Sequence, residues 1–297
     1  MLDLGLARNL ATFALGGAAS IAALGAISHR QITRSVRKPP ESDPDEWNLP
    51  APEQFDVFSR DGVRIRTWLF DGPHDRPTVI VCHGHTAQKR STLGAAAFLR
   101  ERYNVALLDH RGHGESEGDR TTIGRRERLD LLAVLDELEA RGHGPFGVVG
   151  FSMGGAAATH AAAEDGRIQT LVLDSMYAIL RDTVAKVARR RGYPPGLAQL
   201  SAWAGCGVTA LLDGHELREA DPVWVIPRVS PRPILVIQGT DDHLVDSSQA
   251  KSLVTAAGSN AQLWLVDGVG HCKALNEHYP TYRSRVMDFL AGTLPSR

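Results

Sequence analysis

Short apolar stretches alternate with amphipathic ones along the chain from about residue 54 onward. Two β-rich stretches, residues 54–58 and 65–70, flank Asp61-Gly62, a strong turn pair, and so predict a β-hairpin. Six further apolar stretches are too short for helices and predict strands, at residues 78–82, 105–108, 147–150, 170–173, 234–238 and 262–266. Helical patterns lie between them, at residues 92–102, 125–141, 154–163, 247–257 and 279–291.

The continuous apolar character of these strands predicts the class of the sheet. Strands that are buried on both faces and separated by amphipathic helices form a mostly parallel sheet with helices on each side. The predicted fold class is therefore α/β. Ligands of such sheets bind outside the carboxyl ends of the strands, so the chemistry is expected in the residues that follow each apolar stretch.

The N-terminal segment has a different pattern. Residues 10–27 (LATFALGGAASIAALGAI) carry no charge. At about 1.5 Å per residue, a helix of this length just spans a hydrocarbon core of roughly 30 Å. Basic side chains gather after it, at His29, Arg30, Arg34, Arg37 and Lys38. Because Lys and Arg collect on the cytoplasmic side of a short span, we expect residues 1–38 to form a membrane anchor with its basic flank, and the folded body to be cytoplasmic.

Two other interpretations of this segment stay open. A secretory signal would have a basic start, an apolar stretch and a small-residue cleavage site, and would give a secreted protein. Here the basic cluster lies downstream of the apolar stretch, which is the opposite arrangement. A plain buried helix is the third interpretation. Residues 39–53, rich in proline and acid, predict a linker to a folded body at residues 54–297.

The composition excludes several classes of protein. With 33 Lys and Arg against 34 Asp and Glu, the formal net charge is −1, whereas a nucleic-acid binder shows a basic excess. An apolar fraction of 43% is too high for a disordered chain. The cysteines Cys82, Cys206 and Cys272 are too scattered for a disulfide framework, and their spacing does not predict zinc. We therefore expect a globular enzyme that needs no metal and no other cofactor.

One predicted strand end carries a nucleophile pattern. The strand at 147–150 leads into Gly150-Phe151-Ser152-Met153-Gly154, a G-x-S-x-G motif, and a helix of small residues follows. A nucleophile on so tight a turn has a strained backbone, and the flanking glycines leave room for it. Ser152 is therefore the candidate nucleophile. The amides at the start of the following helix would face an incoming oxyanion.

A base and an acid are expected at the same sheet edge. A serine hydroxyl is a weak nucleophile that needs a base, and the base needs an orienting acid. The strand at 234–238 leads into the sequence GTDD, which contains Asp241 and Asp242, and the strand at 262–266 leads into GVGH, which ends at His271. Both segments follow a strand, as Ser152 does. His271 is the candidate base, and either aspartate is a candidate acid.

Two further motifs complete a recognisable set. H-G at residues 83–84 follows the strand at 78–82, and D-x-R-G-H-G-x-S at residues 109–116 follows the strand at 105–108. Together with G-x-S-x-G-G, G-x-x-D, G-x-G-H and the chain order Ser, Asp, His, they resemble the α/β-hydrolase superfamily over residues 54–290. The Gly84-His85 loop and residues 225–229 resemble a membrane-associated serine-hydrolase subgroup. That subgroup includes prolyl-oligopeptidase catalytic domains, Bem46-like proteins and depalmitoylating thioesterases.

The resemblance implies a role for each residue that matches a motif. Ser152 would be the nucleophile and His271 the general base. The pattern G-x-x-D selects Asp242 as the acid, with Asp241 as the adjacent contender. The oxyanion donors would be the backbone amides of Met153 and His85.

Several other residues have expected structural roles. Asp109, Arg111 and His113 are expected to hold the loop after the strand at 105–108 through hydrogen bonds, and Cys272 to be a packing thiol. The stretch at 177–228 is longer than a simple crossover, and we expect it to form a small helical cap over Ser152.

These expectations define a function. We expect a serine hydrolase that cleaves carboxylic ester or thioester bonds through an acyl-enzyme intermediate. Its partner would be a small-molecule, lipid or acyl-protein substrate, with the membrane bound through the N-terminal helix and no nucleic acid. A peptidase or amidase of the same fold is an alternative, and a catalytically inactive binding module is another. The intact set of motifs disfavours the inactive module.

Overall fold

The structure is a computed structural model that describes residues 4–35, 37–39, 42–73 and 75–295, with side chains from residue 19 onward. The chain divides into two compact units. One consists of Met1–Thr33 and Leu180–Leu217, and the other of Arg34–Ile179 and Arg218–Arg297. The predicted domain boundaries and the predicted position of the cap over Ser152 stay predictions.

The larger unit is built on an eight-stranded sheet in the order β1-β2-β4-β3-β5-β6-β7-β8. β2 is antiparallel to both of its neighbours, and the strands from β4 to β8 are parallel. Their bounds are β1 Glu53–Phe58, β2 Arg64–Phe70, β3 Thr78–Cys82, β4 Asn104–Leu108, β5 Phe146–Phe151, β6 Ile168–Asp174, β7 Ile234–Gly239 and β8 Ala261–Val266. The predicted fold class and hairpin are confirmed, and each predicted strand is present within a few residues of its expected bounds.

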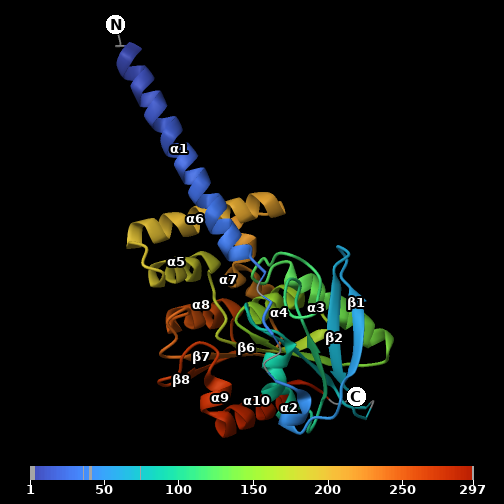
Figure 1. Ribbon diagram of the computed structural model, residues 1–297. Helices are drawn as coiled ribbons and strands as arrows, with labels where there is room; N and C mark the ends of the chain where they lie inside the picture. The colour runs from blue at the N-terminus through green and yellow to red at the C-terminus, as the bar shows by residue number, and fades with distance from the viewer. Residues whose placement is uncertain (1–3, 36, 40–41, 74, 296–297) are drawn as a thin grey trace. The chain divides into compact units, whose positions relative to one another are not determined.

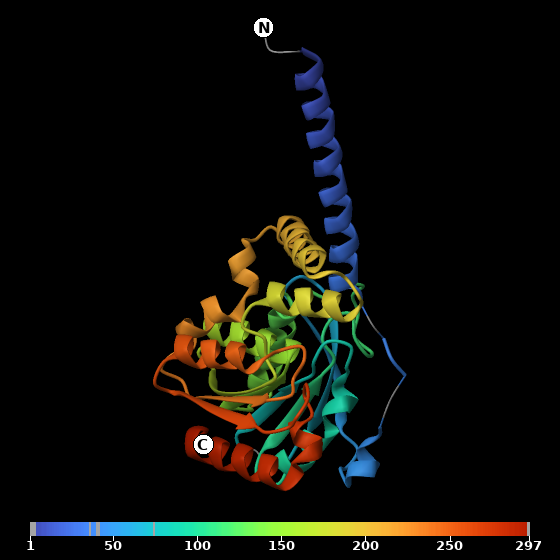
Figure 2. The ribbon, with the colours of Figure 1, turned by 90° about the vertical axis from the view of Figure 1, so that its left-hand side faces the viewer.

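Helices cover both faces of this sheet. Figures 1 and 2 show α2 (Leu93–Leu99), α9 (Ala274–Glu277) and α10 (Tyr279–Thr293) on one face, and α3 (Glu127–Ala140), α4 (Met153–Glu164) and α8 (Ser247–Ala257) on the other. Every residue of β3, β4 and β5 is buried, which explains why their sequences are apolar without alternation. Full burial of a Val, Leu or Ile side chain contributes about 1.5–3 kcal/mol, so these central strands form the core that fixes the sheet edge.

The segment predicted as a linker contains a short helix. η1 (Pro44–Trp47) lies within it, and the Trp47 ring packs so closely on α2 that a Cβ at Gly94 would lie 3.0 Å from it. Leu49 is buried as well. This part of the chain therefore packs on the larger unit. The remaining short helices of this unit are η2 (Lys89–Thr92), α7 (Pro222–Val225) and η4 (Ile226–Val229), and η3 (Leu217–Ala220) lies at the boundary between the units.

The smaller unit consists of three helices, α1 (Leu4–Thr33), α5 (Leu180–Arg190) and α6 (Pro195–Asp213). α1 and α6 cross at small residues. A Cβ at Gly205 would lie 2.6 Å from the Ser28 Cβ, and one at Gly25 would lie 3.1 Å from the Ala204 carbonyl oxygen. One turn further along, the His29 Nδ1 and the Thr209 Oγ1 are 2.8 Å apart. The glycines permit a backbone approach that larger side chains would prevent.

The predicted membrane anchor, residues 10–27, lies within α1. The side chains of residues 10–18 fall outside the described residues. Across the part of the chain that the structure describes, no helix combines the length and the apolar character needed to cross a membrane. The structure therefore does not support the predicted anchor. The cytoplasmic placement, with secretion after signal cleavage as its alternative, stays a prediction.

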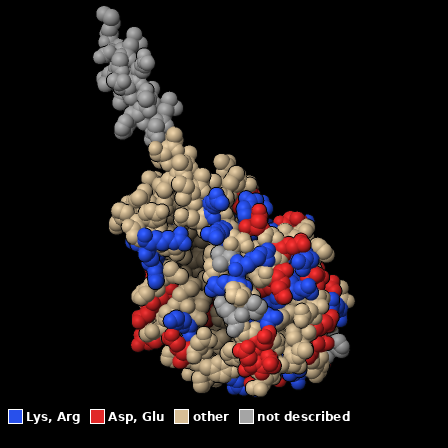
Figure 3. Space-filling view, in the orientation of Figure 1, with Lys and Arg blue, Asp and Glu red and all other residues tan. Residues whose placement is uncertain are grey.

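The surface charges of the larger unit are mixed. On the face shown in Figure 3, Lys and Arg side chains are interspersed with Asp and Glu side chains over this unit. Such a distribution agrees with the formal net charge of −1.

Candidate active site

Ser152 occupies a sharp turn between a strand and a helix. β5 ends at Phe151 and α4 begins at Met153, and Ser152 between them has φ 49° and ψ −111°, a conformation that side-chain-bearing residues rarely adopt. The neighbouring positions require glycine because the surrounding backbone leaves no room for a side chain. A Cβ at Gly150 would lie 2.6 Å from the Gly155 nitrogen, and one at Gly154 would lie 2.3 Å from the Cys82 carbonyl oxygen. The G-x-S-x-G pattern thus folds into the predicted turn.

His271 and Asp242 lie next to this serine, although both are more than 80 residues away in sequence. The His271 Nε2 is 3.0 Å from the Ser152 Oγ, and the His271 Nδ1 is 2.7 Å from the Asp242 Oδ2. The Asp242 side chain is fully buried, and the His271 side chain is 24% exposed. Asp241 is exposed on the neighbouring position of the same loop. The structure therefore brings Asp242, and not Asp241, against the imidazole.

Three donors hold the Asp242 carboxylate in place. Its Oδ1 accepts the backbone N–H groups of Leu244 at 2.8 Å and Val245 at 2.9 Å, and its Oδ2 accepts the Gln238 amide at 3.0 Å. Burial raises the pKa of Asp242, but the hydrogen bond and charge of His271 and the backbone amides of Val245 and Leu244 outweigh it, so the net shift is downward. Asp242 is consequently ionised at neutral pH and accepts a hydrogen bond from the His271 Nδ1.

The protonation of His271 follows from its partners. Because the Asp242 carboxylate accepts only, the neutral imidazole carries its hydrogen on Nδ1 and presents an unprotonated Nε2 to the Ser152 hydroxyl. Burial disfavours the imidazolium, yet the hydrogen bond and the negative charge of the Asp242 carboxylate favour it more strongly, and the pKa of His271 is raised. The arrangement can take a proton from the serine and hold it as a stabilised imidazolium.

The two predicted oxyanion donors lie on the segments that border this serine. Met153 is the first residue of α4, and the first amides of a helix have no partner within the helix. The loop that follows β3 lies against the turn, since a Cβ at Gly84 would be 3.3 Å from the Phe151 carbonyl oxygen and 3.5 Å from the Ser152 Cβ. His85 follows Gly84 in that loop. The positive end of the α4 dipole adds to the preference for an anion here.

Comparisons relate the chain to known proteins. The family model described as Serine aminopeptidase, S33, matches residues 73–204, which include Ser152. The uncharacterized protein YqkD of Bacillus subtilis is 29% identical over 229 residues, which cover 73% of this chain and 72% of that protein. The uncharacterized protein YfhR of Escherichia coli K12 is 27% identical over 263 residues, which cover 84% of this chain and 84% of that protein.

A solved structure extends the match across the fold. The Pyrococcus furiosus esterase Pf2001 is 26% identical, with a TM-score of 0.74 over 88% of this chain and 100% of the esterase. The chain is a member of the α/β-hydrolase superfamily. The family match and the esterase neighbour also support a hydrolase.

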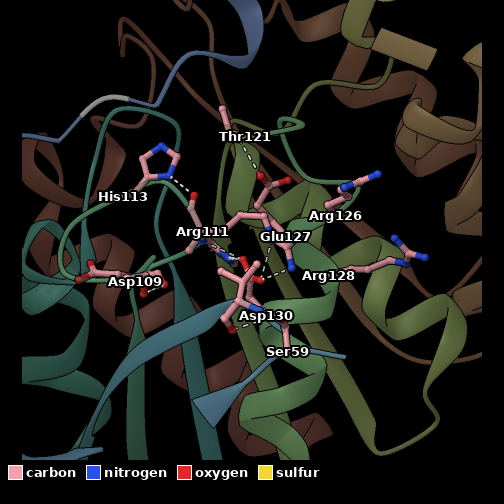
Figure 4. A network of polar contacts seen from close by, with 12 residues as sticks. Ser59, Asp109, Arg111, His113, Thr121, Arg126, Glu127, Arg128 and Asp130 are labelled. Carbon is pink, nitrogen blue, oxygen red and sulfur yellow. Dashed lines mark hydrogen bonds and ion pairs between the residues drawn. The ribbon is translucent and has the colours of Figure 1, made fainter. Parts of the chain in front are cut away.

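In this α/β-hydrolase, the loop after β4 is held by buried ion pairs and hydrogen bonds. The Arg111 guanidinium pairs with Asp130 at 2.7 Å and with Asp61 at 2.6 Å, and Figure 4 shows Arg111 beside Asp130. Asp109 accepts the amide of Lys89 at 2.7 Å and its ammonium group at 2.6 Å. The His113 Nδ1 lies 2.9 Å from the Arg111 carbonyl oxygen. These contacts give Asp109, Arg111 and His113 the structural role that the sequence predicts.

Histidines near the ends of β3 and β4 also have packing roles. The His83 Nε2 accepts the His110 amide at 3.0 Å, and the rings of His83 and His113 are 5.1 Å apart. Burial and the neighbouring histidines lower the pKa of His83 well below its usual value, so this ring is neutral. Among the residues that the structure describes, no group of three or more His, Cys, Asp or Glu side chains could hold a metal ion.

The sequence analysis missed one pair beside this α/β-hydrolase site. Asp174 ends β6 and Ser175 follows it, both buried, and the carbonyl oxygen of Asp174 accepts the Ser152 amide at 2.8 Å. A signal for them was present. They follow the strand predicted at residues 170–173, at the sheet edge where chemistry was expected.

Proposed function

We propose that this α/β-hydrolase cleaves carboxylic ester or thioester bonds through an acyl-enzyme intermediate. In the proposal, Ser152 is the nucleophile, His271 the general base and Asp242 the acid that orients it. One observation carries the proposal: the unbroken line of contacts from the Asp242 Oδ2 through the imidazole to the Ser152 Oγ, with distances of 2.7 Å and 3.0 Å.

The first half of the reaction forms the acyl-enzyme. The Ser152 Oγ attacks the acyl carbon as its proton moves to the His271 Nε2. The carbonyl oxygen becomes an oxyanion that the amides of Met153 and His85 stabilise, each such donor contributing about 3–4 kcal/mol in serine hydrolases. His271 then returns the proton to the departing alcohol or thiol. The bond from the acyl carbon to the leaving group breaks, and Ser152 keeps the acyl group.

The second half repeats these steps with water. His271 removes a proton from a water molecule, whose oxygen attacks the acyl carbon. The carbonyl double bond of the acyl group re-forms as the bond between the acyl carbon and the Ser152 Oγ breaks. His271 returns the proton to the Ser152 Oγ. The products are a carboxylic acid and the free enzyme. No cofactor is needed for either half.

The substrate class is argued from the comparison proteins. The Pf2001 structure is that of an esterase, which favours an ester. The substrate we propose is a small-molecule ester or thioester, or an acylated lipid or protein. The matching family model is described as a serine aminopeptidase, and this favours amide hydrolysis as a second candidate, which uses the same three residues.

An active-site probe tests the proposal. A fluorophosphonate is expected to label the wild-type protein and not Ser152→Ala, while Ser252→Ala, which removes an exposed serine on α8, is labelled normally. A panel of p-nitrophenyl esters, thioesters and aminoacyl amides then separates the candidates, and faster turnover of the esters or thioesters is expected. A folded wild-type protein that takes up no probe would refute the proposal and favour an inactive binding module.

A further inference from the structure

A dipeptide at the carboxyl end of β6 contacts all three segments that carry the proposed triad. The Asp174 carbonyl oxygen accepts the Ser152 amide at 2.8 Å, and the Ser175 amide donates to the Ile237 carbonyl oxygen of β7 at 2.9 Å. The Ser175 hydroxyl oxygen accepts the amide of Cys272 at 3.0 Å. Cys272 directly follows His271, so this last contact holds the backbone next to the proposed base.

The backbone at these contacts is strained. Ser152, Ser175 and Cys272 have φ values of 49°, 55° and 54°, although none of them is glycine. A conformation of this kind costs on the order of 1–3 kcal/mol per residue and persists only where the surroundings hold it. Two of the three strained residues are joined by the hydrogen bond from the Cys272 amide to the Ser175 hydroxyl. The dipeptide therefore lies where the fold holds residues around the site at positive φ.

Asp174 determines which way the Ser175 hydroxyl points. The Ser175 Oγ donates to the Asp174 Oδ1 at 2.8 Å, which leaves its lone pairs for the Cys272 amide. The Asp174 carboxyl group is fully buried, and the Tyr282 hydroxyl lies close enough to interact with it. Burial raises the pKa of Asp174 to about 6, while the hydroxyls of Ser175 and Tyr282 and the charge of His271 favour its ionised form. Burying a carboxyl group is costly, and the hydrogen bond with the Ser175 hydroxyl offsets part of that cost.

We propose that Ser175 is a positioning residue for His271, and that Asp174 orients the Ser175 hydroxyl for this task. The proposal rests on the proposed function, because it assigns these two residues to the geometry of the same base. Neither residue touches the reacting atoms. The hydroxyl fixes the Cys272 amide, the amide fixes the backbone at His271, and the imidazole consequently faces Ser152.

Steady-state kinetics on Ser175→Ala in the full chain test the proposal. We expect kcat on a p-nitrophenyl ester to fall about fivefold to tenfold, as for the loss of one positioning hydrogen bond, with KM unchanged within twofold. Thr170→Val is the matched control. It removes a buried hydroxyl near the opposite end of β6, so it changes stability and leaves kcat unchanged.

Variants of Asp174 separate its role from a general packing role. Asp174→Asn keeps an oxygen that accepts the Ser175 hydroxyl, so its kcat stays within twofold of the wild type. Asp174→Ala lowers kcat as Ser175→Ala does, and the double variant is no slower than Ser175→Ala, because both changes break one chain of contacts. If Asp174→Ala does not fold, comparing the kcat of Ser175→Ala with that of Asp174→Asn still tests whether the Ser175 hydroxyl positions His271.

The outcomes are distinct from a failure of the proposed function. Complete fluorophosphonate labelling of Ser175→Ala at a reduced rate supports the positioning role. A wild-type kcat in Ser175→Ala, or an additive loss in the double variant, overturns it while the triad stands. Labelling of Ser152→Ala would instead overturn the proposed function itself.

Discussion

The choice between two adjacent carboxylates can be tested at the level of one residue. Asp242→Asn removes the charge that favours the His271 imidazolium, and we expect kcat to fall by roughly 10³–10⁴. His271 acts as a base only when neutral, so wild-type activity rises as pH increases through its raised pKa. Without the carboxylate this pKa falls, and the acidic limb of the kcat/KM profile moves to lower pH. Asp241→Asn, on the exposed neighbour, serves as the control and changes kcat less than twofold.

Asp174 makes a separate prediction about stability. Its pKa in the folded protein is raised from 3.8 to about 6 by burial, so the folded state binds more protons than the unfolded state between these values. Stability from this group is therefore lost as pH rises from about 4 to 6, by up to about 3 kcal/mol. Asp174→Asn abolishes this loss, and urea unfolding at pH 4 and pH 8 measures it. Equal pH dependence in the variant and the wild type would contradict the assignment.

Part of the site could be predicted from single residues and part could not. Ser152, His271 and both aspartates were found because each follows a predicted strand, and the parallel strands end at one edge. The choice of Asp242 rested on a family motif, since adjacent residues of a loop differ in burial only through the path of the backbone. Ser175 also follows a predicted strand, but no motif distinguishes it from other residues at the strand ends. Its contact with the Cys272 amide depends on how two loops meet, which spacing along the chain does not reveal.

At the level of elements, two glycines of positive φ allow a matched comparison. A Cβ at Gly114, with φ +47°, would lie 2.2 Å from the Asp109 carboxyl group in the loop after β4, whereas a Cβ at Gly62, with φ +82° in the β1–β2 turn, meets nothing within 4 Å. In both alanine variants the backbone conformation lowers the free energy of unfolding by about 1 kcal/mol, and only Gly114→Ala adds a steric clash. Chemical denaturation should show a loss in Gly114→Ala at least twice that in Gly62→Ala. Equal losses of stability in the two variants would show that the Asp109 side chain can move away from a Cβ at residue 114 without cost.

The elements themselves were largely predictable because their burial is uniform. β3, β4 and β5 are buried along their whole length, so apolar runs marked them directly. The proline-rich segment was harder. Pro44 and its neighbours suggested a linker, yet η1 forms there and Trp47 packs on α2. Local sequence cannot show that a distant glycine, Gly94, leaves room for an indole ring.

The whole molecule is expected to lose stability in acid through buried carboxylates whose pKa is lowered, such as Glu127. Burial opposes ionisation of Glu127, but the Thr121 hydroxyl, the Thr122 amide and hydroxyl, and His110 hold its pKa at about 2. A depressed folded pKa gives stability that is present above about 4.5 and is lost as pH falls toward 2. Glu127→Gln should be about 3 kcal/mol less stable than wild type at pH 7, with a difference that shrinks below pH 4. The control Asp75→Asn, at an exposed position, should change stability at pH 7 by less than about 0.5 kcal/mol.

The N-terminal segment shows the limit of sequence reasoning at the level of the molecule. An apolar run of sufficient length predicts a membrane span, because the hydropathy of a segment does not depend on which parts of the protein it packs against. Gly25, near the end of this run, and Ser28, just after it, lie against α6, where Gly205 permits the close approach. Sequence alone does not show which residues of one helix a second helix will cover.

The most direct test of the account is to trap the acyl-enzyme. Wild-type protein and Asp242→Asn are mixed with a p-nitrophenyl ester, quenched in acid and digested, and the peptides are weighed by mass spectrometry. We predict an added acyl mass on the peptide that contains Ser152 and on no other, with slower build-up in Asp242→Asn. An acyl group found on Cys272, or turnover without any adduct at residue 152, would contradict the central claim.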